Sequence, residues 1–314
     1  MDRRRFLGSL VTAAAAPASA ALAQGGPRRI LGADNGHVAI VSEKGELEWD
    51  APLGGGSHDV QLLRGGNVLV SPAPNQVVEV NKEKQVVWRW ESRQTGPDRV
   101  EIHAFRRLSN GLTMIAETGN RRILEIASDG SIAKTVPLTV EKPNSHRDTR
   151  MVRKTQSGSY LVCHEGDGKI REYDAEGKVV WQYALDLNGR PASPGHGPEG
   201  HGVEVFGAVR LASGNTLIAG GNNNRVLEVQ PDGKIVWSID QKELLGITLA
   251  WITTLQVLPS GNVIFGNCHA GPTNPQLIEV SRDKKVVWTF NDFKNFGNSL
   301  AASQVIGLGR GVIR

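Results

Sequence analysis

The chain has 314 residues and a formal net charge of +4 at neutral pH. A charge balance so close to neutral gives no electrostatic reason to expect nucleic acid or an anionic membrane as a partner. Cys163 and Cys268 are the only cysteines, which is too few for a disulfide framework, although a single bridge between them stays open.

The first 23 residues have the pattern of an export signal. Three arginines at positions 3–5 precede a weakly apolar, Ala-rich stretch that ends in small residues at Ala23. This stretch is shorter than the roughly 20 residues that a membrane span needs, and no other apolar run in the sequence is longer. We therefore interpret residues 1–23 as a twin-arginine (Tat) signal peptide. The mature protein is expected to cross the Tat translocon folded, to be periplasmic or otherwise exported, and to carry a formal charge of +2.

The rest of the chain repeats one unit. An apolar segment, a small turn, a second apolar segment, a segment with a central Glu and a closing Val-Trp pattern follow one another, most clearly over residues 209–237. A glycine in the first turn recurs at intervals of 45, 47, 56 and 47 residues, and its positions are Gly66, Gly111, Gly158, Gly214 and Gly261. The short β-branched segments and this spacing are typical of four-stranded propeller blades.

Two residues of the unit recur too regularly to mark a single site. The closing tryptophans are Trp49, Trp88, Trp181, Trp237 and Trp288, with Lys134 in the remaining copy. The glutamates are Glu79, Glu125, Glu172, Glu228 and Glu279. We predict that both series are structural and that each Trp packs one blade against the next.

The first and last segments complement each other. The N-terminal copy, residues 30–49, lacks its first strand, and residues 303–308 resemble a lone first strand. We therefore predict a single all-β domain over residues 24–314. It is a six-bladed β-propeller of four-stranded antiparallel blades, closed by a C-terminal strand that completes the N-terminal blade.

All eight histidines fall in segments that this fold places on one face. They lie either before the first strand of a blade or near the turn between its second and third strands. The candidate catalytic residues, as a group, are His58, His103, His146 and His201. Neutral His serves as a base and protonated His as an acid, so this pattern indicates a His-rich channel mouth with acid–base or nucleophilic chemistry.

Other polar residues of the same loops are candidates for ligand binding. They are Asn120, Arg147, Arg150, Asn223, Trp251 and His269. Because Arg binds oxyanions through two N–H groups, this combination of residues favours a small polar or anionic ligand. The Gly- and Pro-rich insertion 189–202, which contains His196 and His201, suits either a functional loop or a mobile flap.

A metal ion is a competing use of these histidines. His58, His103, His146 and His201 could converge on one ion, but no close pair has the spacing typical of ligands, so no residue is assigned to a metal.

One segment resembles known propeller repeats. Leu-x-Ser-Gly-Asn-x-Leu-Ile at 211–218, followed by Val-Leu-Glu-Val at 226–229 and Asp-Gly-Lys-Ile-Val-Trp at 232–237, is similar to the repeats of bacterial arylsulfotransferase-like proteins and of the wider quinoprotein-like (PQQ-like) group. The first resemblance implies sulfuryl transfer between phenols through a catalytic histidine. The second implies a PQQ cofactor with a calcium site.

Three functions therefore stay open. The first is an enzyme that binds a polar or anionic ligand at the His-rich mouth, with arylsulfotransferase-like transfer as its most specific form. The second is a non-catalytic module that binds a glycan or a protein partner through the same face. The third is a PQQ-type quinoprotein, so the cofactor stays unknown.

Overall fold

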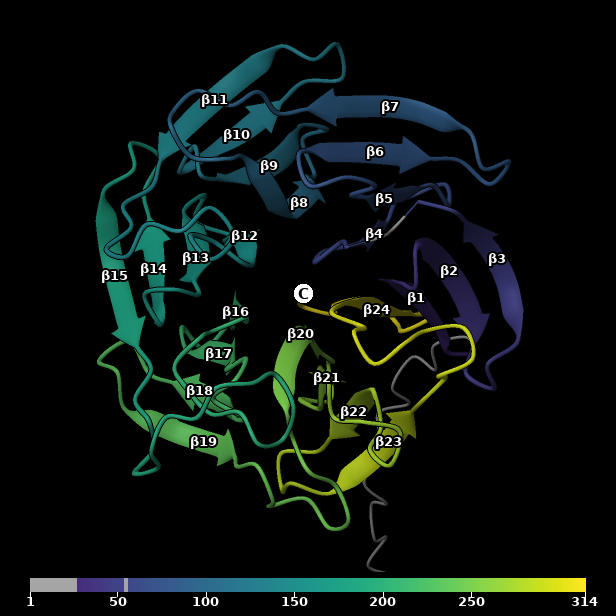
Figure 1. Ribbon diagram of the computed structural model, residues 1–314, viewed down its shortest axis with the longest axis vertical. Coiled ribbons are helices and arrows are strands. Elements are labelled where there is room, and N and C mark those ends of the chain that lie inside the picture. The colour runs from purple at the N-terminus through teal and green to yellow at the C-terminus, as the bar shows by residue number, and fades with distance from the viewer. Residues whose placement is uncertain (1–26, 54–55) are drawn as a thin grey trace, which may run out of the picture.

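The computed structural model describes residues 27–53 and 56–314, and the predicted signal peptide lies outside the described residues. The described chain forms six four-stranded sheets arranged as a ring around a central channel (Figure 1). All pairings within the sheets are antiparallel. The prediction of a six-bladed β-propeller is confirmed. No helix capable of spanning a bilayer occurs in the described part of the chain.

The strands are given blade by blade, from the channel outward. The first blade contains β24 (Ala302–Ile306), β1 (Arg29–Asp34), β2 (His37–Ser42) and β3 (Leu47–Ala51). The second contains β4 (Gln61–Leu62), β5 (Val68–Val70), β6 (Gln76–Val80) and β7 (Val86–Glu91). The third contains β8 (Glu101–Arg107), β9 (Thr113–Thr118), β10 (Arg122–Ile126) and β11 (Ile132–Pro137).

The other half of the ring has the same plan. The fourth blade contains β12 (Val152–Lys154), β13 (Tyr160–His164), β14 (Lys169–Tyr173) and β15 (Val179–Ala184). The fifth contains β16 (Gly207–Arg210), β17 (Thr216–Ala219), β18 (Val226–Val229) and β19 (Ile235–Ile239). The sixth contains β20 (Trp251–Val257), β21 (Val263–Cys268), β22 (Leu277–Val280) and β23 (Val286–Phe290).

The ring closes as the sequence predicts. Strand β24 pairs antiparallel with β1, in a register that places Ile306 opposite Arg29 and Ala302 opposite Ala33. The strand ends two residues earlier than predicted because Gly307 adopts a φ of 83°, outside the β region. Closure of this kind completes the first blade with a fourth strand and joins the two ends of the ring in one sheet.

The hydrophobic core lies between neighbouring sheets. Middle strands such as β17 and β18 are buried along their whole length, whereas the outermost strands alternate between exposed and half-buried residues. One apolar cluster, for example, joins Val209 and Leu217 of the fifth blade to Ile252 and Phe265 of the sixth. The sheets therefore form a rigid wall around the channel, and the loops at its two ends are fixed relative to one another.

The repeated Trp and Glu residues join the blades, as predicted. The indole N–H groups of Trp49, Trp181 and Trp237 donate to backbone carbonyls of the next blade, those of Lys82, Pro231 and Arg282. Each glutamate pairs with a basic residue of the next blade: Glu79 with Arg107, Glu125 with Lys154, Glu172 with Arg210, Glu228 with Arg282 and Glu279 with Arg28.

Candidate functional site

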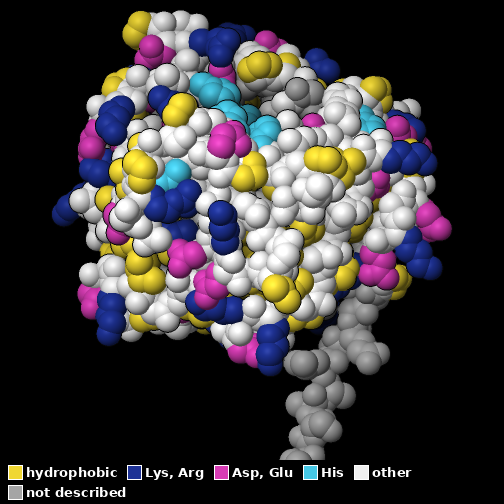
Figure 2. All heavy atoms as spheres, turned by 60° about the horizontal axis from the view of Figure 1, so that its bottom comes forward, with side chains coloured by type: hydrophobic (Ala, Val, Ile, Leu, Met, Phe, Trp, Pro, Cys, Tyr) yellow, Lys and Arg dark blue, Asp and Glu magenta, His cyan; other side chains and the backbone are white. Residues whose placement is uncertain are grey.

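Three of the four predicted catalytic histidines meet at one end of the channel. His103 lies on β8, His58 lies in the segment that leads into β4, and His146 lies in the loop before β12. Ring centroids are 4.4 Å apart for His58 and His103, 5.0 Å for His103 and His146, and 5.9 Å for His58 and His146. Figure 2 shows histidine side chains gathered on one face of the molecule.

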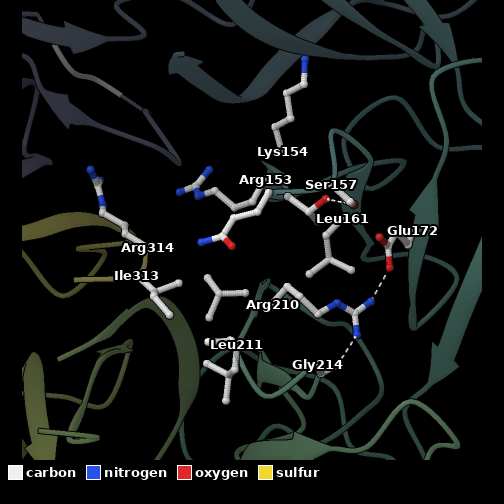
Figure 3. A pocket seen from close by; sticks show the side chains of 14 residues that line it. Arg153, Lys154, Ser157, Leu161, Glu172, Arg210, Leu211, Gly214, Ile313 and Arg314 are labelled. Atoms are coloured by element: carbon white, nitrogen blue, oxygen red, sulfur yellow. Dashed lines mark hydrogen bonds and ion pairs between the residues drawn. The ribbon is translucent and has the colours of Figure 1, made fainter. Parts of the chain in front are cut away.

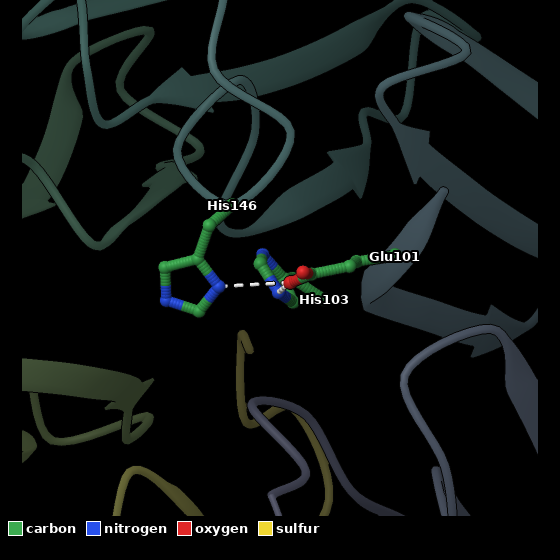
Figure 4. A group of neighbouring side chains, drawn as sticks. All are labelled: Glu101, His103 and His146. Carbon is green, nitrogen blue, oxygen red and sulfur yellow. Dashed lines mark hydrogen bonds and ion pairs between the residues drawn. The ribbon is translucent and has the colours of Figure 1, made fainter. Parts of the chain in front are cut away.

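A buried carboxylate links two of these rings. Glu101 Oε2 accepts hydrogen bonds from His103 Nε2 at 3.0 Å and from His146 Nδ1 at 2.8 Å (Figure 4). The other oxygen, Oε1, pairs with Arg99 at the rim. We call His58, Glu101, His103 and His146 the histidine mouth.

Local strand geometry places Glu101 and His103 together. The pairing of β8 with β9 shifts between Ile102 and Ala104, which leaves His103 as the extra residue of a β-bulge. A bulge changes the direction of the side chains next to it, and here two residues of one strand that are two positions apart make a direct hydrogen bond.

The second ring nitrogen of His103, Nδ1, lies near both a hydrogen-bond acceptor and a hydrogen-bond donor. His103 Nδ1 lies 3.1 Å from the carbonyl oxygen of Thr149, which can only accept, and 3.3 Å from Nη1 of Arg150, which can only donate. Arg150 is itself buried and forms an ion pair with Glu165. One tautomer of neutral His103 donates to Glu101 and accepts from Arg150, and the other donates to Thr149 and leaves Nε2 unprotonated.

Burial keeps the imidazoles of His58 and His103 neutral. Burial lowers the pKa of His103 to about 4, aided by the charge of Arg150 and opposed by the hydrogen bond to Glu101. Burial also lowers the pKa of His58 well below its usual value, and Arg150, His103 and His146 add to this effect. Burial acts to raise the pKa of Glu101, but the hydrogen bonds from His103 and His146 outweigh it and hold that pKa far below the usual range. The mouth therefore holds an ionised carboxylate beside the neutral rings of His58 and His103.

Two cavities open beside these residues. One of about 340 Å³ is lined by His58, His103 and His146 together with Arg99 and Glu101. The other, of about 410 Å³, is lined by His58 and His269 with Asp34 and Asn35. His58 lines both, so it forms the wall between them.

A second aromatic group lies on the far side of His58. The ring of His196 packs 4.5 Å from Trp251 and 5.3 Å from His269, measured between centroids. Burial, with the nearby His196, lowers the pKa of His269, and Asp34 and Glu199 oppose this shift. His269 and Trp251, both predicted ligand-binding residues, thus lie together.

The other predicted site residues are engaged in loop structure. His201 bonds Asn224 Oδ1 at 3.0 Å and the Leu187 carbonyl at 2.9 Å, so the structure does not bring it to the histidine mouth. Arg147 pairs with Glu204. Asn120 donates to the carbonyl of Arg93 and to Glu117, and Asn223 donates to the carbonyls of Asp186 and Gly202. Of the predicted ligand-binding residues, Arg150 alone contacts the mouth.

Sequence reasoning missed Glu101, Arg99 and the partnership of His196 with Trp251. Glu101 stands two positions before His103, but His103 is the extra residue of a bulge, so the alternation of a regular strand does not predict their contact. His196 lies in the irregular loop 189–202, whose path no periodicity reveals. Cys163 and Cys268 are both buried free thiols, so the bridge that the sequence left open is not formed.

The donor set favours one kind of metal over another. One ligand atom each from Glu101, His103 and His146 lies within 4.8 Å of the other two, a group that could hold a metal ion. Imidazole with carboxylate suits zinc, iron, copper or nickel, whereas calcium prefers oxygen ligands. The mouth therefore does not fit the calcium-supported quinone site that the quinoprotein resemblance implies, and we derive no step through that cofactor.

Comparisons with known proteins agree on the architecture. A protein of unknown function from Bacteroides caccae has a TM-score of 0.74 at 22% identity, over 89% of this chain and 99% of that one. A streptogramin B lyase has a TM-score of 0.55 at 13% identity, over 88% of this chain and 86% of that one. A virginiamycin B lyase from Staphylococcus aureus with quinupristin has a TM-score of 0.54 at 14% identity, over 86% of each chain. These similarities show the fold alone.

No curated relative matches the sequence. A family model described as outer membrane protein assembly factor BamB matches residues 34–290, which is most of the chain and includes five blades completely and the first blade in part. The chain therefore belongs to this BamB family of PQQ-like propellers.

Proposed function

We propose that the protein is an enzyme that binds a small polar or anionic substrate at the histidine mouth and transfers or eliminates a group with His146 as base or nucleophile. The observation that carries the proposal is the hydrogen bond from His146 to the buried carboxylate of Glu101 in the wall of a cavity. Small-molecule sites commonly combine such a cavity with a few convergent polar groups.

The chemistry follows from the atoms of this pair. Donation from His146 Nδ1 to Glu101 fixes the tautomer in which Nε2 carries a lone pair. The His146 side chain is 51% exposed, so Nε2 remains within reach of a substrate. A carboxylate that orients an imidazole also stabilises the imidazolium that forms when Nε2 takes a proton. His103 donates to the same carboxylate and so positions it.

The surroundings suit a substrate with negative charge. Arg99 stands at the rim of the cavity and Arg150 lies behind His103, so two guanidinium groups favour a developing anion. Neutral His58 lines the same cavity and is the second group able to exchange a proton.

Sulfuryl transfer is the most specific form of this proposal, because the repeats resemble those of arylsulfotransferase-like proteins. In that reaction His146 Nε2 attacks the sulfur of an aryl sulfate, the S–O bond breaks, and the phenolate leaves and takes up a proton. A second phenol then attacks sulfur, loses its proton and releases the histidine. The matched virginiamycin B lyase lends separate support to histidine chemistry on propellers, since a variant of it in which alanine replaces a histidine is described as catalytically inactive.

The test is turnover of 4-nitrophenyl sulfate with phenol as acceptor by the mature protein, alongside lactone and ester substrates for elimination and hydrolysis. We expect His146→Ala to reduce kcat by about 10²- to 10⁴-fold, the usual contribution of a positioned acid–base group. His37→Ala is the matched control, because His37 belongs to the same face but bonds the Asn295 carbonyl outside the mouth. A wild-type protein that binds these ligands without turning any over, and loses binding in His146→Ala, would instead be the non-catalytic module for a glycan or protein partner.

A metal-dependent enzyme is the second candidate, and one contact favours it. Metal-bound histidines commonly donate their other ring N–H to a carbonyl, as His103 Nδ1 does to Thr149 in one of its tautomers. In that form Glu101, His103 and His146 would hold the ion, which would supply Lewis acidity. Elemental analysis of protein purified without chelator decides between the candidates: a stoichiometric transition metal that Glu101→Gln abolishes supports the metal, and a metal-free active protein excludes it.

We also propose that residues 1–23 direct export through the Tat pathway. The support is the run of arginines at positions 3–5 before an Ala-rich stretch. Replacement of all three arginines with lysine is expected to leave the protein in the cytoplasm, as measured by fractionation. Unchanged export in this variant would contradict the proposal.

A further inference from the structure

The innermost strands carry six residues at one equivalent register position. These are Gln61, Arg106, Arg153, Val209, Gln256 and Gln304, which face Leu69, Met114, Leu161, Leu217, Ile264 and Leu31 on the neighbouring strands. The three glutamines connect adjacent blades: their side-chain oxygens accept from the backbone N–H groups of Arg107, Val305 and Leu62 at 2.8, 2.6 and 2.9 Å. The two arginines break this pattern and bring charge into the channel instead.

A single carboxylate accompanies these arginines. Arg153 forms a two-point ion pair with Asp59, with N–O distances of 2.8 and 3.1 Å. A third guanidinium comes from Arg314, whose Nη2 lies 3.8 Å from Asp59 and whose Nη1 donates to Gln304 at 2.7 Å. The side chains of Asp59, Arg153 and Arg314 are 2%, 7% and 5% exposed. We call Asp59, Arg106, Arg153 and Arg314 the arginine cluster.

Two N–H groups of the cluster lack partners. Among residues 27–53 and 56–314, no hydrogen-bond acceptor reaches the buried Nη1 of Arg106 or the buried Nε of Arg153. Burial lowers the pKa of Arg106 to about 10, with Arg153 adding to the effect and Asp59 opposing it. Burial and the charge of Arg106 likewise lower the pKa of Arg314 well below its usual value. Three neighbouring guanidinium groups with one side-chain carboxylate, and buried donors without acceptors, are costly unless an anion completes the cluster.

The cluster borders two cavities at the end of the channel opposite the histidine mouth. One, of about 360 Å³, is lined by Arg153 and Arg314 together with the turn residues 155–157, and Figure 3 shows the Arg153 side chain extending toward Arg314. The other, of about 340 Å³, is lined by Arg106 and Arg314. These turns join first to second strands, whereas the histidines lie on loops of the other face, so a ligand here would enter independently of the mouth.

We propose that Arg106, Arg153 and Arg314 form a binding site for a divalent oxyanion of the sulfate or phosphate class. Three guanidinium groups beside the one side-chain carboxylate of Asp59 leave an excess of positive charge on the side chains, which an oxyanion offsets. Guanidinium forks match the oxygen edges of tetrahedral oxyanions and give strong charge-assisted hydrogen bonds. The site shares no residue with the histidine mouth and does not depend on its function.

Calorimetric titration of the mature protein with sodium sulfate tests the proposal, in a gluconate buffer of matched ionic strength. We expect saturable binding that weakens by about 10- to 100-fold in Arg106→Met, since that variant removes charge-assisted hydrogen bonds at similar side-chain volume. Arg282→Met is the matched control, because Arg282 pairs with Glu228 between two blades, and it should bind sulfate as the wild type does. Absence of saturable binding in the wild type, or equal affinity in Arg106→Met, would overturn the proposal.

Two further measurements identify the class of ligand and locate the bound anion. A free ion and an oxyanion group on a small organic molecule share this chemistry, and a parallel titration with phenyl sulfate distinguishes them: tighter binding than sulfate assigns the site to a larger ligand. If Arg106→Met does not fold, wild-type crystals soaked in selenate replace it. An anomalous peak between Arg106 and Arg153 supports the site, and an empty cluster at saturating selenate contradicts it.

Discussion

The two ends of the channel handle charge in opposite ways. At the histidine mouth one ionised carboxylate, Glu101, lies beside the imidazoles of His58 and His103, which burial holds neutral, and its oxygens have donors from three residues. At the arginine cluster three guanidinium groups share one carboxylate, and two of their N–H groups lack acceptors within the described chain. The first arrangement leaves a lone pair available for proton transfer, and the second leaves positive charge available for holding an anion. The same scaffold thus supports chemistry at one end and electrostatic binding at the other.

The largest expected effect is on kcat and comes from a substitution in the histidine mouth. Glu101→Gln removes the charge that stabilises an imidazolium on His146, so we expect kcat on any substrate turned over to fall by about 10²- to 10⁴-fold, with a smaller change in KM. Steady-state kinetics measure both constants. A rise in KM with kcat unchanged would show that Glu101 holds the substrate and does not position the histidine.

The next largest effect is on stability and comes from a substitution in the arginine cluster. Asp59→Asn leaves three buried guanidinium groups without a carboxylate, and we expect the free energy of unfolding to fall by about 3–5 kcal/mol. Chemical denaturation in gluconate buffer measures it. Asp50→Asn, at an exposed position paired with Lys84, is the control and should cost less than about 1 kcal/mol. Equal losses in the two variants would mean that the cluster has no special charge imbalance.

Acid should lower the free energy of unfolding through the buried histidines. Burial lowers the pKa of His164 to about 4, although its bond to the Asp148 carbonyl opposes the shift. A folded-state pKa below the unfolded value of about 6.5 means that the unfolded chain binds the proton more readily. Stability is therefore full above pH 6.5 and is lost as the pH falls toward 4, by about 3 kcal/mol for this residue.

Denaturation midpoints between pH 4 and 8 check this dependence, and His164→Gln should reduce it, while the buried His58 and His103 account for the remainder. The arginine cluster is expected to contribute little to this pH dependence. Burial lowers the pKa of Arg106 only to about 10, above this pH range, and the ion pairs with Arg153 and Arg314 outweigh burial and lower the pKa of Asp59. If the wild type and His164→Gln lose stability equally on acidification, the buried histidine is not responsible.

The smallest effect separates two members of the cluster. Arg314 lies farther from Asp59 than Arg153 does, at 3.8 Å against 2.8 Å, and its buried guanidinium also donates to Gln304 and to the Val60 carbonyl. Arg314→Met should therefore lower stability in gluconate by about 1–2 kcal/mol, the cost of those hydrogen bonds, and by less than the loss of the two-point ion pair in Arg153→Met. Thermal unfolding compares it with Arg153→Met, which leaves Asp59 without its two-point partner. A loss in Arg314→Met as large as that in Arg153→Met would contradict this ranking.

The fold was predictable because the residues that build it recur. The Trp and Glu series appear in successive units, and closure follows from one incomplete unit and one spare strand, which pair as β1 and β24. The histidine mouth was predictable only in part. His58 and His103 stand at equivalent positions in the repeat, although His103 lies on β8 itself and His58 lies before β4. Glu101 joins them through a local bulge, and His201 forms its hydrogen bonds inside an irregular loop instead. Contacts set by single loops leave no periodic trace in a sequence.

Two residues of the arginine cluster could have been identified from the sequence repeats. Arg106 and Arg153 stand where Gln61 and Gln256 stand in other blades, so comparing repeats would have singled them out. The contribution of Asp59 and Arg314 could not be foreseen, because both lie outside the regular strands and reach the cluster through the path of the backbone.

His146, held by Glu101 through its Nδ1, is proposed to present its Nε2 lone pair to ligands at the mouth. Nitrogen NMR of protein labelled with ¹⁵N only in histidine tests it most directly, because it assigns the tautomer of each ring and follows it during titration with 4-nitrophenyl sulfate. We predict that His146 carries its proton on Nδ1 and that the signals of His58, His103 and His146 shift with the ligand while that of His201 stays unchanged. A proton on Nε2 of His146, or ligand-induced shifts confined to histidines outside the mouth, would contradict the account.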